Sequence, residues 1–279
     1  MKNKLIISLA IAAISVIACG QTPEERVKAY EEAHEAMMQE YKQTMDSLSN
    51  DQEKAQAFYD DFVKRYIDFN LTAAKKNPYN EVAVQVLMNL RGLIEDDQVS
   101  AIISKMTEEM LANETVANLK KGLDARIATA EGQPFVDFTV NSCVGQTKSI
   151  PAEPIYADVK LSDYVGKGKY ILLDFWSPWC GPCRREMPNI KAVYDKYKGD
   201  KFDVVSIAVW ERQPVEVTIE TAAKLEMTWN QINNGKREPA ELYGVEGIPH
   251  LILFGPDGTI LKRGFHGAEI EEVVSSYVK

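Results

Sequence analysis

The sequence of 279 residues is poor in cysteine and histidine, with four of the former and three of the latter. So few cysteines exclude a disulfide-rich scaffold, which needs several pairs to hold a small fold together. Basic residues do not outnumber acidic ones, because 32 Lys and Arg face 41 Asp and Glu, for a net charge of −9. Nucleic-acid binding needs a clustered basic surface, so we expect no nucleic acid among the partners.

Long apolar runs are also missing, except at the start of the chain. Lys2 and Lys4 precede an apolar stretch over residues 5–18, which has the pattern of a signal peptide. This stretch is too short to span a membrane comfortably. Residues 1–19 are therefore predicted to be a processed leader and not a part of the mature fold.

The end of this leader, Val16-Ile17-Ala18-Cys19, resembles a bacterial lipobox, in which the cysteine becomes the lipid-modified first residue after cleavage. The alternative is a plain signal peptide that ends near a cysteine. Stable anchoring generally needs more than one acyl chain, and the resemblance implies several. We expect an exported protein in the cell envelope, anchored to the inner or outer membrane through Cys19 and facing the periplasm.

Glycine is almost absent from Glu24 to about Ala130, and Pro23 and Pro78 are the main breakers of this region. Apolar residues recur there at three- and four-residue spacing, which favours helix. The methionines and aromatics of this stripe could line a partner groove, but core packing is the simpler interpretation. Residues 20–131 are predicted to form an all-α N-terminal domain, with a first helix that includes Val27 to Leu48 and further helices over 52–76, 80–94, 98–111 and 116–130.

Glycine and proline become frequent from Gly132 onward, and short apolar runs replace the helical spacing. The segment Gly255-Pro256-Asp257-Gly258 is a strong hairpin turn signal. Residues 132–279 are therefore predicted to form an α/β domain, with a central mixed sheet and flanking helices. The expected strands cover 135–140, 170–176, 202–210, 251–254 and 259–263, and a closing helix covers 269–278.

The segment Trp179-Cys180-Gly181-Pro182-Cys183 runs from a buried-strand pattern into a predicted helix start. Two cysteines separated by two residues can close a small disulfide ring. At a helix N-terminus, free backbone N–H groups and the helix dipole stabilise a thiolate and lower its pKa below the free value of about 8.5. Because the thiolate is the attacking species in disulfide exchange, the segment predicts a redox-active disulfide.

Trp-Cys-Gly-Pro-Cys is the thioredoxin motif, and the longer run from Asp174 to Pro188 resembles the TlpA/ResA branch of extracytoplasmic thioredoxin-like proteins. This resemblance covers roughly residues 133–279 and implies a thioredoxin-like fold. The N-terminal half is similar, more weakly, to the helical extension of Bacteroidetes-type lipoproteins. The resemblance implies that Cys180 is the exposed nucleophile that forms a mixed disulfide, and that Cys183 is the resolving thiol that releases it.

Two acidic residues are implied to assist the cysteines. Asp174 corresponds to the buried acid beneath the motif, where desolvation makes a carboxyl group hold its proton more tightly and lets it relay that proton to or from Cys183. Glu186 falls where this branch places a second acidic residue near the site. A solvated helix face is the alternative for Glu186.

Gly247-Ile248-Pro249 resembles the loop in which thioredoxins keep a cis-proline opposite the cysteines. In the family, this loop pairs with an extended substrate peptide by strand addition. Ile248 and Pro249, together with Trp179 and Pro182, are therefore the expected substrate-binding residues. His250 could tune the site or face solvent.

The function predicted from these features is that of a protein thiol-disulfide oxidoreductase, with no cofactor beyond the Cys180–Cys183 disulfide. Gly-Pro between the cysteines resembles reducing thioredoxins, so we expect reduction of exported proteins such as apocytochromes, with electrons from a membrane thiol carrier. The alternatives are a disulfide oxidase or isomerase, a copper-handling thioredoxin-like protein, and a lipoprotein that only binds a partner. No metal site is predicted, because zinc would need two further ligands and only Cys143 and scattered histidines are available. Cys143 itself is expected to be a buried apolar residue, with a reactive third thiol as the alternative.

Overall fold

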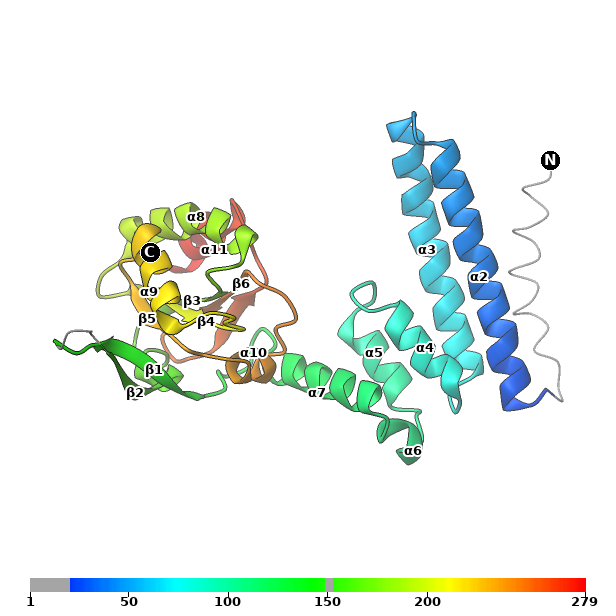
Figure 1. The fold of residues 1–279 in the computed structure, drawn as a ribbon, viewed down its shortest axis with the longest axis horizontal. Helices are drawn as coiled ribbons and strands as arrows, with labels where there is room; N and C mark the ends of the chain where they lie inside the picture. Colours follow the sequence, from blue (N-terminus) through cyan, green and yellow to red (C-terminus); the bar gives the residue numbers. More distant parts are fainter. Residues whose placement is uncertain (1–20, 149–152) are drawn as a thin grey trace. The chain divides into compact units, whose positions relative to one another are not determined.

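The computed structural model describes residues 21–148 and 153–279 (Figure 1). The predicted leader, with Cys19, lies outside the described residues. The chain divides into two units, of which one ends at Lys120 and the other spans Lys121–Lys279. This division falls inside helix α7 (Glu114–Ala128), whereas the sequence places the boundary just after that helix. None of the helices in the described part of the chain is both long and apolar enough to cross a membrane.

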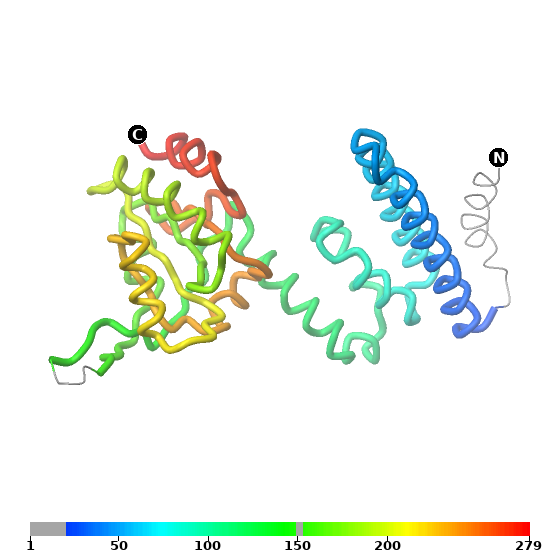
Figure 2. The backbone as a smooth tube through the Cα atoms, turned by 45° about the horizontal axis from the view of Figure 1, so that its top comes forward, coloured from blue at the N-terminus to red at the C-terminus, as the bar shows by residue number. Residues whose placement is uncertain are grey.

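The first unit begins with two long antiparallel helices, α2 (Pro23–Ser47) and α3 (Gln52–Lys76), which Figure 2 shows side by side. Thr22 and Glu25 cap α2 by a reciprocal capping box. Asp51 caps α3 by accepting a hydrogen bond from the backbone N–H of Lys54. The methionine and aromatic stripe packs in the core, as predicted, in a cluster that includes Tyr30, Met37, Phe62 and Phe69.

Shorter helices follow, and here one prediction is wrong. The segment 98–111 is not one helix but parts of two, α5 (Asp96–Ile103) and α6 (Glu108–Leu111). The chain turns after Ile103, and Thr107 then starts α6 by accepting a hydrogen bond from the N–H of Met110. Helix α4 (Glu81–Asn89) is also shorter than the predicted 80–94, since Gly92 adopts a left-handed conformation with φ +74°.

The second unit contains a five-stranded mixed sheet in the order β5-β4-β3-β6-β7. β3 is central and pairs in parallel with β4 and antiparallel with β6. The predicted α/β class with a mixed sheet is confirmed, while β5 is too short to have given a sequence signal. The strands are β3 (Tyr170–Trp176), β4 (Phe202–Ala208), β5 (Asn230–Ile232), β6 (His250–Phe254) and β7 (Ile260–Arg263).

Helices cover both faces of this sheet. Alternate side chains of β3 point to opposite faces, so Leu172 and Trp176 face one buried cluster while Leu173 and Phe175 face another. The first cluster includes residues of α8 (Gly181–Tyr197), α9 (Val215–Lys224) and α11 (Glu269–Tyr277). The second includes residues of α10 (Glu238–Leu242) and the short η1 (Leu161–Asp163).

The predicted strand over 135–140 is largely wrong. The strand here is β1 (Thr139–Gln146), which pairs antiparallel with β2 (Pro154–Lys160) in a sheet of its own. Before β1 the chain makes only scattered hydrogen bonds and no continuous ladder, because the N–H of Phe135 donates to the carbonyl of Gly258, that of Val136 to Tyr243 Oη and that of Phe138 to Asp137. Of the predicted strand, only the last two residues, Thr139 and Val140, pair with β2.

Candidate active site

The two cysteines of the motif lie where β3 leads into α8, and they form a disulfide with a Cα–Cα distance of 5.3 Å. Cys180 is the N-cap residue of α8, and its Sγ accepts a hydrogen bond of 3.1 Å from the backbone N–H of Cys183. The sulfur thus takes the place that an oxygen occupies in an ordinary N-cap. After reduction, the same N–H and the helix dipole would favour the thiolate of Cys180 over its thiol.

Cys180 is less accessible than the resemblance implied. The residue is only 3 % exposed, and Cys183 is 0 % exposed, so the prediction of an exposed Cys180 is wrong for the disulfide form. The cause is its capping role, which turns the sulfur back onto the helix and places it 3.6 Å from the carbonyl oxygen of Ile248. Of the two cysteines, Cys180 is the more exposed.

The loop before β6 provides the opposite side of the site. Its Ile248–Pro249 peptide bond is cis, as the resemblance implied. The Ile248 carbonyl faces Cys180 Sγ, and because a disulfide sulfur has no hydrogen, this contact becomes a hydrogen bond only when a thiol forms. The carbonyl therefore favours the thiol of Cys180, and the N–H of Cys183 favours the thiolate.

Asp174 lies in the middle of β3 and is completely buried. Its Oδ2 accepts a hydrogen bond of 2.9 Å from Ser206 Oγ on β4, and Ser206 Oγ in turn accepts one of 2.8 Å from Trp229 Nε1. Asp174 Oδ1 has no hydrogen-bond partner among the described residues. Burial raises the pKa of Asp174 to about 7, with the Ser206 bond acting against this shift and the charge of Glu186 adding to it.

The side chain of Asp174 points to the sheet face that α8 covers. It follows Leu172 and precedes Trp176 at two-residue spacing, and both of those side chains belong to the buried cluster that contains Cys180 and Cys183. A carboxyl group that changes its protonation near neutral pH is therefore buried on the same face as Cys183.

Glu186 lies on α8, one turn after Cys183, and is only 9 % exposed. Its Oε1 accepts hydrogen bonds from Asn189 Nδ2 at 2.7 Å and from the backbone N–H of Gly267 at 3.0 Å. The alternative of a solvated helix face is therefore wrong. Glu186 fastens the start of α8 to the segment that leads into α11.

The exposed side of the motif is formed by Trp179 and Pro182. Trp179 is 37 % exposed, its Nε1 donates to the carbonyl of Trp210 at 2.9 Å, and the Arg212 guanidinium lies 4.2 Å from its ring centroid. Such a cation–π contact holds the ring in place. Pro182 lies exposed in the first turn of α8. Trp176, by contrast, is fully buried and backs the motif from inside.

His250 does not face solvent freely. Its Nε2 lies 3.3 Å from Arg263 Nη2, and the Arg263 guanidinium also donates to the carbonyls of Thr129 and Tyr243. Burial lowers the pKa of His250 to about 4, with Arg263 and His266 adding to the shift. At neutral pH the ring is therefore uncharged and can accept a hydrogen bond from Arg263.

Sequence reasoning missed three of these residues, namely Ser206, Trp229 and Arg263. Ser206 gave a usable signal, because a hydroxyl residue within a mostly apolar strand needs a buried partner. Trp229 and Arg263 gave none, since they reach Ser206 and His250 only through tertiary packing.

Other candidate groups contribute little to the site. Among residues 21–148 and 153–279, no group of three or more His, Cys, Asp and Glu side chains could hold a metal ion. Cys143 is a buried free thiol, 3 % exposed, with its Sγ 3.4 Å from the Gly145 carbonyl, which confirms the prediction of a buried residue.

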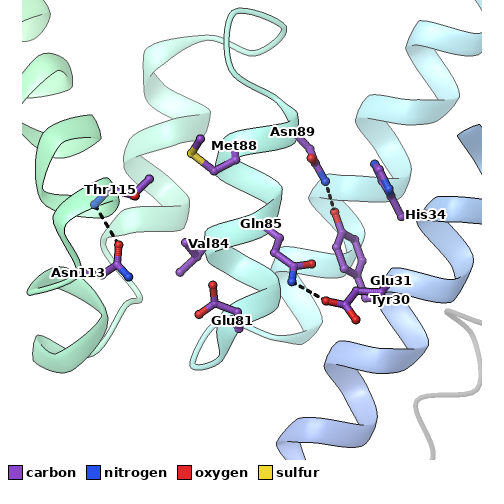
Figure 3. A pocket seen from close by; sticks show the side chains of 10 residues that line it. All are labelled: Tyr30, Glu31, His34, Glu81, Val84, Gln85, Met88, Asn89, Asn113 and Thr115. Atoms are coloured by element: carbon purple, nitrogen blue, oxygen red, sulfur yellow. Dashed lines mark hydrogen bonds between the residues drawn. The ribbon is translucent and has the colours of Figure 1, made fainter.

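The helical unit has a cavity of about 420 Å³, shown in Figure 3. Its polar side chains largely bond to one another, since Asn89 donates to Tyr30 at 2.8 Å and Gln85 donates to Glu31 at 2.9 Å. His34, on its edge, has its Nε2 2.9 Å from the hydroxyl of Tyr66. None of the predicted site residues lines this cavity.

Comparison with known proteins gives three findings. The model of the AhpC/TSA family matches residues 132–263. The thiol-disulfide oxidoreductase ResA of Oceanobacillus iheyensis is 29 % identical over 130 residues, covering 46 % of this chain and 60 % of the relative. ResA of Geobacillus kaustophilus is 27 % identical over 154 residues, covering 55 % of this chain and 79 % of the relative. The chain thus spans less than two thirds of the Oceanobacillus relative.

Among solved structures, the thioredoxin domain of a thiol-disulfide oxidoreductase from Bacteroides vulgatus is similar to this chain. It is 26 % identical with a TM-score of 0.45, and the match covers 54 % of this chain and 99 % of that domain.

Proposed function

We propose that the chain is an extracytoplasmic protein thiol-disulfide oxidoreductase, because the model of the AhpC/TSA family matches residues 132–263 and the ResA relatives are thiol-disulfide oxidoreductases. The observation that carries the proposal is the Cys180–Cys183 disulfide at the N-terminus of α8, with the N–H of Cys183 on Cys180 Sγ. Such a pair stores two electrons as thiols and releases them as a disulfide, so the reaction needs no other cofactor.

Catalysis begins from the reduced pair. The thiolate of Cys180 attacks one sulfur of a substrate disulfide, the substrate S–S bond breaks, and the other substrate sulfur leaves as a thiolate that takes a proton from water. A mixed disulfide now joins Cys180 to the substrate. One substrate sulfur is now a thiol and the other remains bound to Cys180, so the transfer of the electron pair is completed only when Cys183 resolves the mixed disulfide.

Release of the substrate requires Cys183 to lose its proton. Asp174, with a pKa of about 7, can accept that proton in its carboxylate form. The Cys183 thiolate then attacks Cys180 Sγ, the mixed disulfide breaks, and the second substrate sulfur leaves and is protonated. The products are a substrate dithiol and the Cys180–Cys183 disulfide.

The loop at Ile248 and Pro249 is the proposed docking element for the substrate. It lies against Cys180, so an extended peptide that pairs with its backbone would place a disulfide beside the attacking sulfur. The exposed ring of Trp179 provides an apolar surface on the other side of the motif. These contacts would orient the substrate for in-line attack.

The proposed direction is reduction of exported proteins, such as apocytochromes, with electrons from a membrane thiol carrier. Gly181 and Pro182 between the cysteines support it, since this pair is typical of reducing thioredoxins. Equilibration with dithiothreitol or glutathione buffers tests it: a reductase should have a potential near about −270 mV, and one near about −120 mV would indicate an oxidase.

The proposed location is the cell envelope, with the chain anchored through Cys19 and facing the periplasm. The lipobox resemblance supports it. Mass spectrometry of the N-terminal peptide from membranes tests this point, because a processed lipoprotein begins at a modified Cys19, whereas a plain signal peptide leaves that residue unmodified or absent.

Substrates and activity are tested together by trapping. A Cys183→Ser variant cannot resolve the mixed disulfide, so exported proteins should accumulate in covalent complexes with Cys180. A Cys180→Ser variant is the control and should trap none. Equal capture by both variants would contradict the proposed roles, and a cellular phenotype unaffected by Cys180→Ser would indicate a binding module.

A further inference from the structure

The helical unit carries a second cavity, of about 580 Å³, where the first turn of α2, the last turn of α3 and the loop to α4 meet. Figure 1 shows the start of α2 and the end of α3 at the same end of the helix pair. Its lining includes Arg26, Lys75 and Lys76 and no acidic residue. The chain as a whole has a net charge of −9, so the positive charge of this lining is opposite to the overall charge.

The loop that closes this cavity is firmly held. Asn77 is 3 % exposed, and its Nδ2 donates to the carbonyl of Ala73 at 3.0 Å. Asn80 caps α4 by accepting a hydrogen bond of 3.1 Å from the N–H of Val82. Tyr79 therefore projects from a braced loop, and it is 70 % exposed.

Two polar atoms at the cavity lack partners. Arg26 Nε and Gln21 Oε1 are inaccessible to solvent and have no hydrogen-bond partner among the described residues. An anion would provide the acceptor that Arg26 Nε lacks, and rotation of the Gln21 amide would present its NH₂ group to the same anion. The acidic residues of this turn do not compete, because Glu24 and Glu25 do not line the cavity and Glu25 Oε2 accepts from the N–H of Thr22.

We propose that this cavity binds the phosphate group of an anionic membrane lipid. The inference rests on the proposed lipid anchor at Cys19. Only Gly20 stands between Cys19 and Gln21 in the chain, and two residue steps span at most about 7 Å. Acyl chains on Cys19 would therefore hold the membrane surface at the edge of the cavity, so that its cationic side chains meet lipid headgroups.

A lipid headgroup fits the surroundings better than free phosphate, although both offer the same anionic oxygens. Tyr79 stands exposed beside the cationic side chains, and tyrosine is enriched at the membrane–water interface, where its ring and hydroxyl are both accommodated. Lysine and arginine near an anionic leaflet are attracted to it. Binding at the cavity would thus set the orientation of the helical unit relative to the membrane surface.

Hydrogen exchange of the full lipidated chain tests the proposal. The chain is reconstituted in phosphatidylcholine vesicles that contain increasing fractions of phosphatidylglycerol, and exchange is followed over residues 74–80. We expect protection to grow with the phosphatidylglycerol fraction. Lys75→Gln should raise the fraction needed for half-maximal protection about fivefold, and Arg26→Gln with Lys75→Gln should abolish protection in the accessible range.

The matched control is the pair Lys42→Gln and Lys64→Gln, which removes the same charge from exposed positions on the same two helices. This control should keep the protection. Three results would overturn the proposal: equal exchange in both lipids, equal loss of protection in the control, or the same protection from inorganic phosphate added to phosphatidylcholine vesicles.

The test also separates this proposal from the proposed function. Disulfide reduction by the Arg26→Gln/Lys75→Gln variant should equal that of the wild type, so a failure at the cavity leaves the redox proposal intact. An unmodified Cys19 would refute the anchor and this inference with it. Loss of thiol exchange in the wild type would refute the activity alone.

Discussion

Ser206 lies directly opposite Asp174 in the parallel pairing of β4 with β3, and its hydroxyl donates a 2.9 Å hydrogen bond to the buried carboxyl group. That hydroxyl is itself fixed by Trp229 Nε1. The bond favours the charged form of Asp174, whereas burial favours the neutral form. Because burial has the larger effect, the carboxyl group changes its protonation near pH 7, as the proposed proton exchange with Cys183 requires.

Ser206→Ala should raise the pKa of Asp174 further. The variant loses the one hydrogen bond that lowers this pKa, which corresponds to about one pH unit for a bond of about 1.5 kcal/mol to a charged group. The rising limb of the pH–rate profile for substrate release should move to higher pH by that amount. An unchanged profile would show that the hydroxyl does not set the proton affinity of Asp174.

Asp174→Asn should remove a pH dependence of stability. Since the folded-state pKa is about 7 and the usual value is 3.8, the unfolded chain ionises first, and wild-type stability should fall as pH rises from about 4 to 7 and then level off. The full loss is about 4 kcal/mol. Urea unfolding of the oxidised protein at pH 5 and pH 8 captures about 2.6 kcal/mol of this loss, and the variant should show little difference between the two pH values.

The same variant should be slower in resolution. General base assistance contributes about 100-fold or more to proton transfer steps, so release of the mixed disulfide should slow by at least about 100-fold. Single-turnover release of a fluorescent substrate thiol reports this step. Resolution at the wild-type rate would remove Asp174 from the mechanism.

Glu186→Ala and Glu186→Gln should separate structure from charge. The alanine variant leaves the N–H of Gly267 and the amide of Asn189 without their acceptor and should lose about 1 to 3 kcal/mol of unfolding free energy. The glutamine variant keeps an acceptor oxygen but removes the charge that raises the pKa of Asp174, so its pH–rate profile should shift to lower pH. Identical profiles for Glu186→Gln and wild type would contradict the electrostatic coupling.

His250 should contribute to acid sensitivity. Its folded-state pKa of about 4 lies below the usual value of 6.5, so its contribution to stability is present above about pH 6.5 and is lost as pH falls towards 4. The loss is about 3 kcal/mol at most. His250→Gln should unfold at lower pH than the wild type in an acid titration, with Lys167→Gln, at an exposed position of the same unit, as the control.

Elements with strong local signals were predicted to the residue. The helix over Gln52–Lys76 begins after the capping Asp51 and ends before Asn77-Pro78, which disfavours helix. The strand over Tyr170–Trp176 is continuously apolar except for Asp174. Periodicity alone was a weaker guide. Over residues 98–111 the helix is interrupted and Thr107 caps a new one. Within residues 135–140 a hydrogen bond from Val136 to the distant Tyr243 takes the place of strand pairing.

The part of the site formed by residues close together in the sequence was predictable. Spacing placed Cys180 and Cys183 at a helix start, and the resemblance placed Asp174 and Pro249 around them. Exposure of Cys180 depends on its contact with Ile248, 68 residues away, and therefore could not be read from the motif. The contacts of Ser206 and Trp229 likewise follow from strand pairing and tertiary packing, which the spacing of residues in the sequence does not reveal.

The central claim is that the sulfur of Cys180 is held as a reactive anion by the start of α8. Its most direct test is the pH dependence of iodoacetamide alkylation of the reduced chain, with Cys183→Ser used to leave Cys180 as the one thiol of the motif. We expect Cys180 to react with a pKa below the ordinary value of about 8.5, and a Cys143→Ala background should leave the result unchanged. A pKa at or above 8.5 would contradict the account.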